Sequence, residues 1–454
     1  MPEPAARVEA GADRPRGGIW ALGELARPGS YRRLAGRVKY PVAALMISQT
    51  VLTFALTAVL TRVLGPQAFG EYAVILTAAG IFQLVAAFPV ESGLPKFLAE
   101  TGRQDLPRLR AYYSAGLWLR LAAGLAGFAA CLPLAGWLGR VYGVPGAAGA
   151  IVLAAAGQCL FAPGAGYFLA CIQGMERPRR WATANLLNAA LVFPLATLGA
   201  AAFGRWGQVG LQGAIALGWL ACVALSGVLA RGALGFLAPG RGGRRQMPGL
   251  AWFLLPMWVV PLAGFGALTL VKTALALRWG AVAVGHLEVA LSLLRHMGFV
   301  YHACMIVLLP EWSRLYADQQ GAELRRSLAE ARGVLVGIAL GYGALLALGG
   351  GWLVPRLFGA DQAGAVPTVR VIGLVMPVMI AGWMASATNI VCGRTGNIGK
   401  ANVIWFSLVV PVSLVLLPRL GALGVALGWL GAYCVFSWYY VSRARPFFGE
   451  IEGW

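Results

Sequence analysis

Residues that could bind an anion or exchange a proton recur along one otherwise apolar stretch of the chain, 284–309. They are Glu288, Ser292, Arg295, Phe299 and His302. Steps of four, three, four and three residues place them on one face of an α-helix. The stripe is about 21 Å long at a rise of 1.5 Å per residue. An ionisable side chain is costly in hydrocarbon, so we predict that this face points into the protein interior or a water-filled cavity.

The stripe allows two interpretations. Arg295 could supply charge-assisted hydrogen bonds to an anionic ligand, with Ser292 and His302 lining the same cavity. Alternatively, Glu288 and Arg295 compensate each other in a buried network that holds helices together. His296 lies at the edge of the stripe. The histidines have no cysteine or carboxylate at a spacing typical of metal ligands, so we expect no metal site and no cofactor.

Other charges lie within or beside apolar segments. Lys272 either joins the same cavity or extends to the outer membrane interface. Arg120 is a further candidate for the cavity, although its position near the end of a segment, like that of Arg370, favours extension to the interface. For Glu91 and Lys96, which flank the inner end of a segment, we expect a local ion pair.

The segments that must position these residues are long enough to cross a bilayer. Together with the 59% hydrophobic and 12% charged composition, they predict an all-α polytopic membrane protein with about twelve transmembrane helices. The expected spans are 40–61, 73–94, 113–138, 147–172, 181–203, 209–230, 251–277, 284–309, 333–356, 366–391, 400–418 and 420–442.

The basic residues predict the orientation of these spans. Of the 37 Lys and Arg, only six fall in alternate loops that would be outside, Arg62, Arg140, Arg205, Arg278, Arg356 and Arg419. This bias places both termini in the cytoplasm, as expected for the cytoplasmic membrane. We expect a basic cytoplasmic tail at 1–39 and a second tail at 443–454. The net charge of +20 then indicates contact with anionic membrane lipid and no nucleic-acid partner.

Enzyme signatures are not found. The chain has no Walker-type GxxxxGK[ST], GxSxG or HExxH motif, and no paired carboxylates suited to acid–base catalysis stand out among its 17 acidic residues. The seven cysteines show no CxxC spacing and lie inside predicted spans, where buried small hydrophobic residues are expected. We therefore predict that the protein is not an enzyme.

The two halves of the chain look related. An offset of 215 residues pairs Gly65 with Gly280 and Gly70 with Gly285, each pair at the same place relative to the spans. Six spans per half give both halves one orientation, as in transporters with parallel repeats. The predicted division is thus a six-helix bundle at 40–230, a cytoplasmic linker at 231–250 and a second six-helix bundle at 251–442.

Four segments after predicted spans carry a family resemblance. They are RVLGPQAFGEY (62–72), GLPKFLAE (93–100), IQGMER (172–177) and LLPEWSRL (308–315). In order and spacing, the chain from about 40 to 440 resembles the polysaccharide and oligosaccharide flippases, which transport O-antigen and exopolysaccharide precursors. Their superfamily also includes multidrug and toxin extruders and lipid II flippases. Two departures are the lack of spans thirteen and fourteen and a lysine, Lys272, where related flippases often carry an acid.

This resemblance implies two bundles around a V-shaped cavity that opens alternately to each side. It also implies a substrate, an undecaprenyl-pyrophosphate-linked oligosaccharide moved from the inner to the outer leaflet, with polysaccharide polymerase or assembly proteins as further partners. Arg295 would be the leading headgroup contact, supported by Lys272 and Arg120. Glu288 would tune it or couple transport to an ion. The alternatives are a cation-coupled multidrug extruder, an enzyme acting on the same lipid-linked sugars and a non-transporting envelope-assembly protein.

Overall fold

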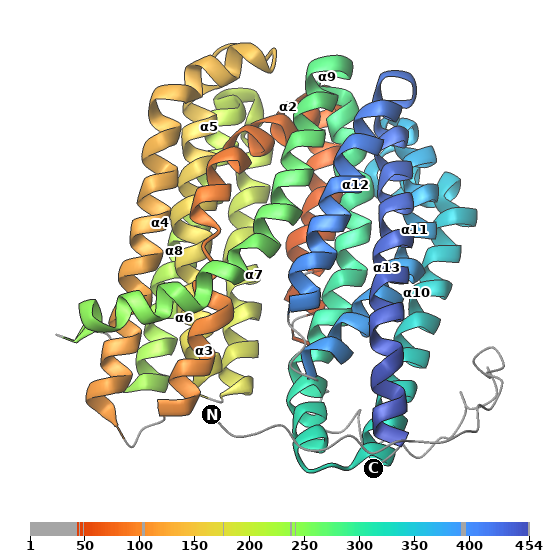
Figure 1. Ribbon diagram of the computed structural model, residues 1–454. Coiled ribbons are helices and arrows are strands. Elements are labelled where there is room, and N and C mark those ends of the chain that lie inside the picture. The colour runs from red at the N-terminus through yellow and green to blue at the C-terminus, as the bar shows by residue number, and fades with distance from the viewer. Residues whose placement is uncertain are drawn as a thin grey trace, which may run out of the picture.

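The computed structural model describes residues 43–44, 46–48, 50–101, 105–175, 177–236, 238–240, 242–391 and 396–452. In these residues every regular element is a helix (Figure 1). The predicted tail at 1–39 lies outside them, and of the second tail 443–452 continues the last helix. The elements are η2 (Thr50–Ala55), α2 (Leu56–Ala86), α3 (Val90–Thr101), α4 (Leu106–Val141), α5 (Ala148–Ala155), η3 (Ala156–Phe161), α6 (Ala162–Gly174), α7 (Pro178–Ala201), α8 (Phe203–Leu234), α9 (Gly243–Ala317), α10 (Gly321–Phe358), η4 (Ala360–Ala365), α11 (Val366–Val391), α12 (Gly396–Leu420) and α13 (Ala422–Glu452).

Ten continuous helical stretches of the described chain are long and apolar enough to cross a membrane. Two of them, 46–99 and 257–305, each contain two of the predicted spans. The chain reverses inside them at Gly65 (φ 72°) and Gly280 (φ 76°). Positive φ is readily available to glycine because it has no Cβ. Because the two turns each divide one stretch in two, the ten stretches correspond to the twelve predicted transmembrane spans. The predicted all-α polytopic fold is therefore confirmed.

The helices form two groups (Figure 1). Helices α3 to α8 lie in one and α10 to α13 in the other, with α2 and α9 between them. The first turns of α9 nevertheless belong to the core of the first group, where Leu250 and Leu254 pack with Val90 and Leu94. The boundary between the two packed groups of helices therefore does not coincide with the predicted linker 231–250. The predicted domain bounds stay a prediction made from the sequence.

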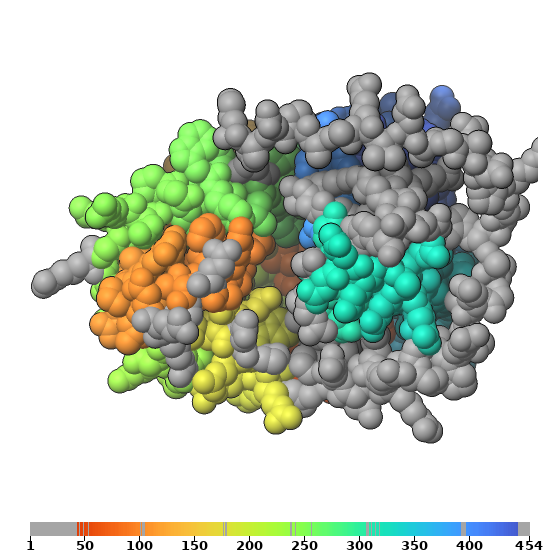
Figure 2. Space-filling view, turned by 60° about the horizontal axis from the view of Figure 1, so that its bottom comes forward, coloured from red at the N-terminus to blue at the C-terminus, as the bar shows by residue number. Residues whose placement is uncertain are grey.

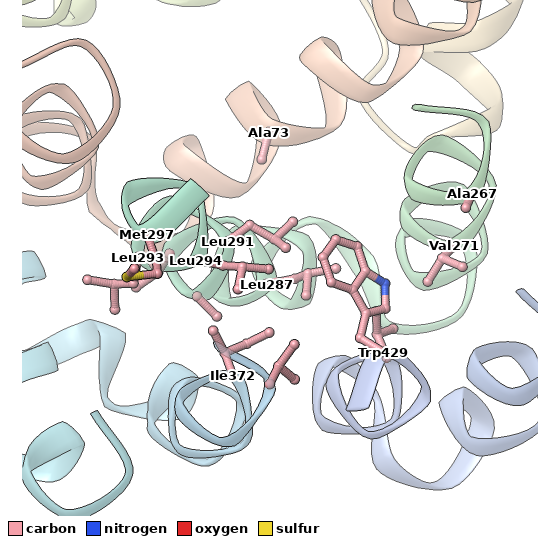
Figure 3. Packing of buried hydrophobic residues seen from close by; sticks show 14 of the residues in the cluster. Ala73, Ala267, Val271, Leu287, Leu291, Leu293, Leu294, Met297, Ile372 and Trp429 are labelled. Atoms are coloured by element: carbon pink, nitrogen blue, oxygen red, sulfur yellow. The ribbon is translucent and has the colours of Figure 1, made fainter. Parts of the chain in front are cut away.

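The second segment of α9, after Gly280, is the centre of the larger core. Leu287, Leu291 and Leu294 are buried and fill the space between α2 at Ala73 and α11 at Ile372 (Figure 3). These leucines are three to four residues apart and so follow one face of the helix. The charged stripe runs along the same segment, so its depth in the molecule is fixed by this packing.

The paired glycines of the sequence repeat meet in space. A Cβ built on Gly70 of α2 would lie 2.4 Å from the carbonyl oxygen of Ala281, and one on Gly285 would lie 3.2 Å from the Cα of Gly70. Backbones this close require small residues. Nearby, the Tyr142 and Thr273 hydroxyls are 2.7 Å apart, which adds a second link between the two halves of the chain. The end of the molecule that holds Gly65 and Gly280 is thus held closed.

We expect Gly70→Ala to destabilise the protein, because the new methyl group must displace the Ala281 carbonyl. Overpacking of this kind costs about 1–3 kcal/mol. Thermal unfolding in detergent should show a melting temperature lowered by several degrees. Gly136→Ala is the matched control, since nothing lies within 4 Å of a Cβ built there. Equal melting temperatures for the two variants would contradict the close approach.

Candidate functional site

The turn at Gly280 brings Lys272 and Glu288 together. Each is eight residues from Gly280, one before it and one after, so the antiparallel segments of α9 place them side by side. The Lys272 ammonium donates to one oxygen of the Glu288 carboxylate, and Nη2 of Arg295 donates to the other. Glu288 is therefore shared between two cations. We call Lys272, Glu288 and Arg295 the charge triad.

Burial differs sharply within the charge triad. The Lys272 and Glu288 side chains are 9% and 8% exposed, whereas that of Arg295 is 41% exposed. Lys272 thus does not extend to the membrane interface, and that alternative was wrong. Glu288 and Arg295 do compensate each other, but the triad keeps one surplus positive charge. That charge is accessible at Arg295.

Ser292 and His302, both predicted to line the cavity, are placed differently. Ser292 is fully buried, and its hydroxyl donates to the Val289 carbonyl at 2.7 Å. His302 is exposed and stacks on Trp383 of α11, with ring centroids 5.4 Å apart. It lies about 10 Å along the helix from Arg295, at 1.5 Å per residue. Of these two residues, only His302 is exposed.

Arg120 is not part of the charge triad. Its side chain is 5% exposed and donates to Glu91 at 2.9 Å and to the carbonyls of Phe88 and Ala86. The predicted extension of Arg120 to the interface and the predicted Glu91–Lys96 pair were therefore wrong. Helix α2 ends at Ala86 and α3 begins at Val90, so the break leaves backbone carbonyls without helical partners. The planar guanidinium supplies several donors at once and satisfies them.

The sequence contains a signal for the Lys272 contact that helical periodicity alone does not detect. Lys272 and Glu288 are equidistant from a glycine at a predicted turn, which is the spacing expected of partners across a helical hairpin. The Arg120 contact depends on where α2 breaks; Pro89 marks that break, but nothing in the sequence indicates which side chain satisfies the carbonyls there. In the described residues no group of three His, Cys, Asp or Glu side chains is arranged to hold a metal.

A polytopic all-helical protein, with a charge triad on the helical hairpin between two groups of helices, has the architecture of a membrane transporter. The chain belongs to the polysaccharide biosynthesis protein family, whose profile matches residues 42–315. No protein of a curated sequence set matches it.

Solved structures that share the fold include the following two. One is an inward-facing multidrug resistance MATE family transporter of the MOP superfamily, with a TM-score of 0.69 and 17% identity over 89% of this chain and 96% of that one. The other is the lipid II flippase MurJ in an inward closed conformation, with a TM-score of 0.65 and 12% identity over 88% and 87%. At these identities the likeness concerns the fold.

We expect Glu288→Leu to be strongly destabilising, because it leaves two cations uncompensated. Breaking a buried pair in this way costs about 3–5 kcal/mol. The melting temperature in detergent should fall markedly, and adding Lys272→Met should recover most of the loss by removing the more deeply buried cation. The control is Glu330→Leu, which breaks an exposed pair with Arg326 at 3.0 Å and should cost little. A similar loss in the two glutamate variants would contradict a buried triad.

We expect Arg120→Met to loosen the α2–α3 break, since it removes the donors to the Ala86 and Phe88 carbonyls. Hydrogen exchange measured by mass spectrometry should become faster at residues 86–92. Arg140→Met changes an exposed arginine at the other end of α4 and should leave this exchange unchanged. Unaltered protection in Arg120→Met would show that the carbonyls do not depend on Arg120.

Proposed function

We propose that this protein moves an undecaprenyl-pyrophosphate-linked oligosaccharide from the inner to the outer leaflet of the cytoplasmic membrane, for the synthesis of cell-surface polysaccharide. The observation that carries the proposal is the surplus positive charge of the triad, accessible at Arg295. A pyrophosphate bears roughly two negative charges and cannot enter hydrocarbon unaided. An exposed guanidinium at the depth of a membrane span is a group that can receive it.

The guanidinium of Arg295 has donors to spare. One of its five N–H groups is given to Glu288 and a second, on Nε, is buried without a partner among the described residues, which leaves the other N–H groups of the two terminal nitrogens for a ligand. Charge-assisted hydrogen bonds to phosphate oxygens use such planar, paired donors. A single accessible cation also permits release, which a dense cluster of charges would hinder. Lys272 takes part indirectly, by holding Glu288.

Glu288 is best suited to tuning Arg295. Both of its carboxylate oxygens are occupied, one by each cation, so the carboxylate holds Arg295 in place and limits its net charge. A cation-coupled multidrug extruder would need a buried carboxylate with an oxygen available to the coupling ion. In the described spans, the buried carboxylate of Glu288 and the half-buried carboxylate of Glu91 are each paired with a basic side chain. This pairing favours an anionic substrate over that alternative, and the transporter architecture argues against catalysis.

The packing supports transport by alternating access. The close contact of Gly70 with Ala281 joins the halves at one end of the molecule. At the opposite end, Figure 2 shows a furrow between the helices of the first half and residues of the second. That end carries basic residues such as Arg179 and Arg244, which supports a cytoplasmic orientation for it. With that orientation, the furrow would open toward the inner leaflet.

Transport of the headgroup should depend on Arg295. We expect purified protein in liposomes to expose a fluorescent undecaprenyl-pyrophosphate oligosaccharide in the opposite leaflet, and Arg295→Ala to reduce the rate at least tenfold, since loss of one charge-assisted contact is worth about 1.5–3 kcal/mol. Arg295→Lys should retain part of the rate. The control is Arg370→Ala, an exposed arginine of α11.

Three outcomes would redirect the assignment. Wild-type transport that survives Arg295→Ala would remove the site from the triad. No transport by folded wild-type protein, together with cation-driven drug efflux, would favour the extruder. Neither activity would favour a non-transporting assembly protein.

A further inference from the structure

A pocket of about 410 Å³ opens between α7 and α8, away from the charge triad. Its lining combines two cations with apolar and small residues, namely Arg179, Arg180, Thr183, Val228, Leu229 and Gly232. The basic residues come from the first turn of α7 and the others from the adjoining turns of α7 and α8. The proposed transport cycle assigns no role to this pocket.

The pocket lies at the ends of two membrane spans, the level at which lipid headgroups are expected. Helix α7 begins at Pro178 and α8 ends at Leu234, so both spans enter or leave the membrane here. At the pocket and beyond it these helices expose large apolar side chains, Val228 of the lining at 66% and Leu187 further along α7 at 39%. Exposed side chains of this kind are suited to contact with acyl chains. The charged end of the pocket is thus continuous with an apolar surface.

The two arginines are available to an anion. Both are exposed, and no carboxylate of the described chain pairs with either. Arg180 is held at the pocket by a hydrogen bond from Nη1 to the Gly232 carbonyl, which leaves its other N–H groups free of that contact. A guanidinium positioned in this way loses little conformational freedom when it binds a phosphate, and its planar fork matches phosphate oxygens.

We propose that this pocket binds the phosphodiester headgroup of an anionic glycerophospholipid, with the acyl chains lying along α7 and α8. Basic pockets between transmembrane helices at the membrane interface have the chemistry for such headgroups. The ligand would be a structural lipid that stays bound and anchors the first half of the protein in the bilayer. This inference does not depend on the proposed transport activity, because lipid binding can be measured without transport.

The test is native mass spectrometry of the delipidated full-length protein, titrated with phosphatidylglycerol or phosphatidylcholine. We expect tighter binding of phosphatidylglycerol, and an affinity for it about tenfold weaker in Arg179→Gln/Arg180→Gln. The matched control is Arg244→Gln/Arg245→Gln, which removes two consecutive exposed arginines at the same end of the molecule. Arg179→Gln alone keeps the contact between Arg180 and Gly232 and should give an intermediate loss, so a failure of the double variant to fold would not end the test.

Three results would overturn the proposal. Equal affinity for the two lipids would mean that the pocket does not distinguish lipid headgroups by their charge. Equal losses in the pocket and control variants would indicate attraction by the basic surface in general. Displacement of phosphatidylglycerol by undecaprenyl pyrophosphate at an equal or lower concentration would assign the pocket to the transported lipid instead.

Discussion

The sharing of one carboxylate between two cations is the interaction on which the interior of this protein depends. Glu288 cannot be accommodated among leucines as an isolated charge, and neither can Lys272. The helical hairpin around Gly280 places the two side chains opposite each other, so each charge compensates the other. What remains is the charge of Arg295, which is not buried as the others are. The charge triad therefore combines a buried ion pair with one accessible cation on the same helix.

Backbone proximity is the second constraint, and it comes from the smallest residues. Gly70 and Gly285 are equivalent in the two halves by sequence, and they touch where the halves meet. Gly65 and Gly280 make the equivalent turns. The sequence repeat therefore has a structural consequence. Each half contributes one glycine at the equivalent position, and these two glycines form a single close contact between the halves. Larger side chains at these positions would separate the helices that position the charge triad.

Much of the fold could be read from the sequence, because hydrophobic segments in lipid have few alternatives to helix. Twelve spans and the turns at Gly65 and Gly280 follow from apolar length and glycine placement. The stripe from Glu288 to His302 was likewise visible as helical periodicity. The pairing of Lys272 was within reach of the same reasoning, whereas that of Arg120 was not. Arg120 binds carbonyls freed by the interruption at Phe88, and an interruption inside an apolar segment leaves no mark in hydropathy. The fate of Ser292 also escaped prediction, because a hydroxyl can turn back to its own helix instead of facing a cavity.

The hairpin at Gly280 has a consequence for any conformational cycle. Lys272 and Glu288 lie in the two segments of one helical hairpin, joined by the turn at Gly280, so a rotation of the two helix groups does not have to separate them. Their attraction then contributes the same free energy to each state. It therefore cancels from the free-energy difference that sets the populations of the two states. An inward- and an outward-open form can therefore remain close in free energy despite a buried ion pair. The equilibrium between them can then respond to the environment of Arg295.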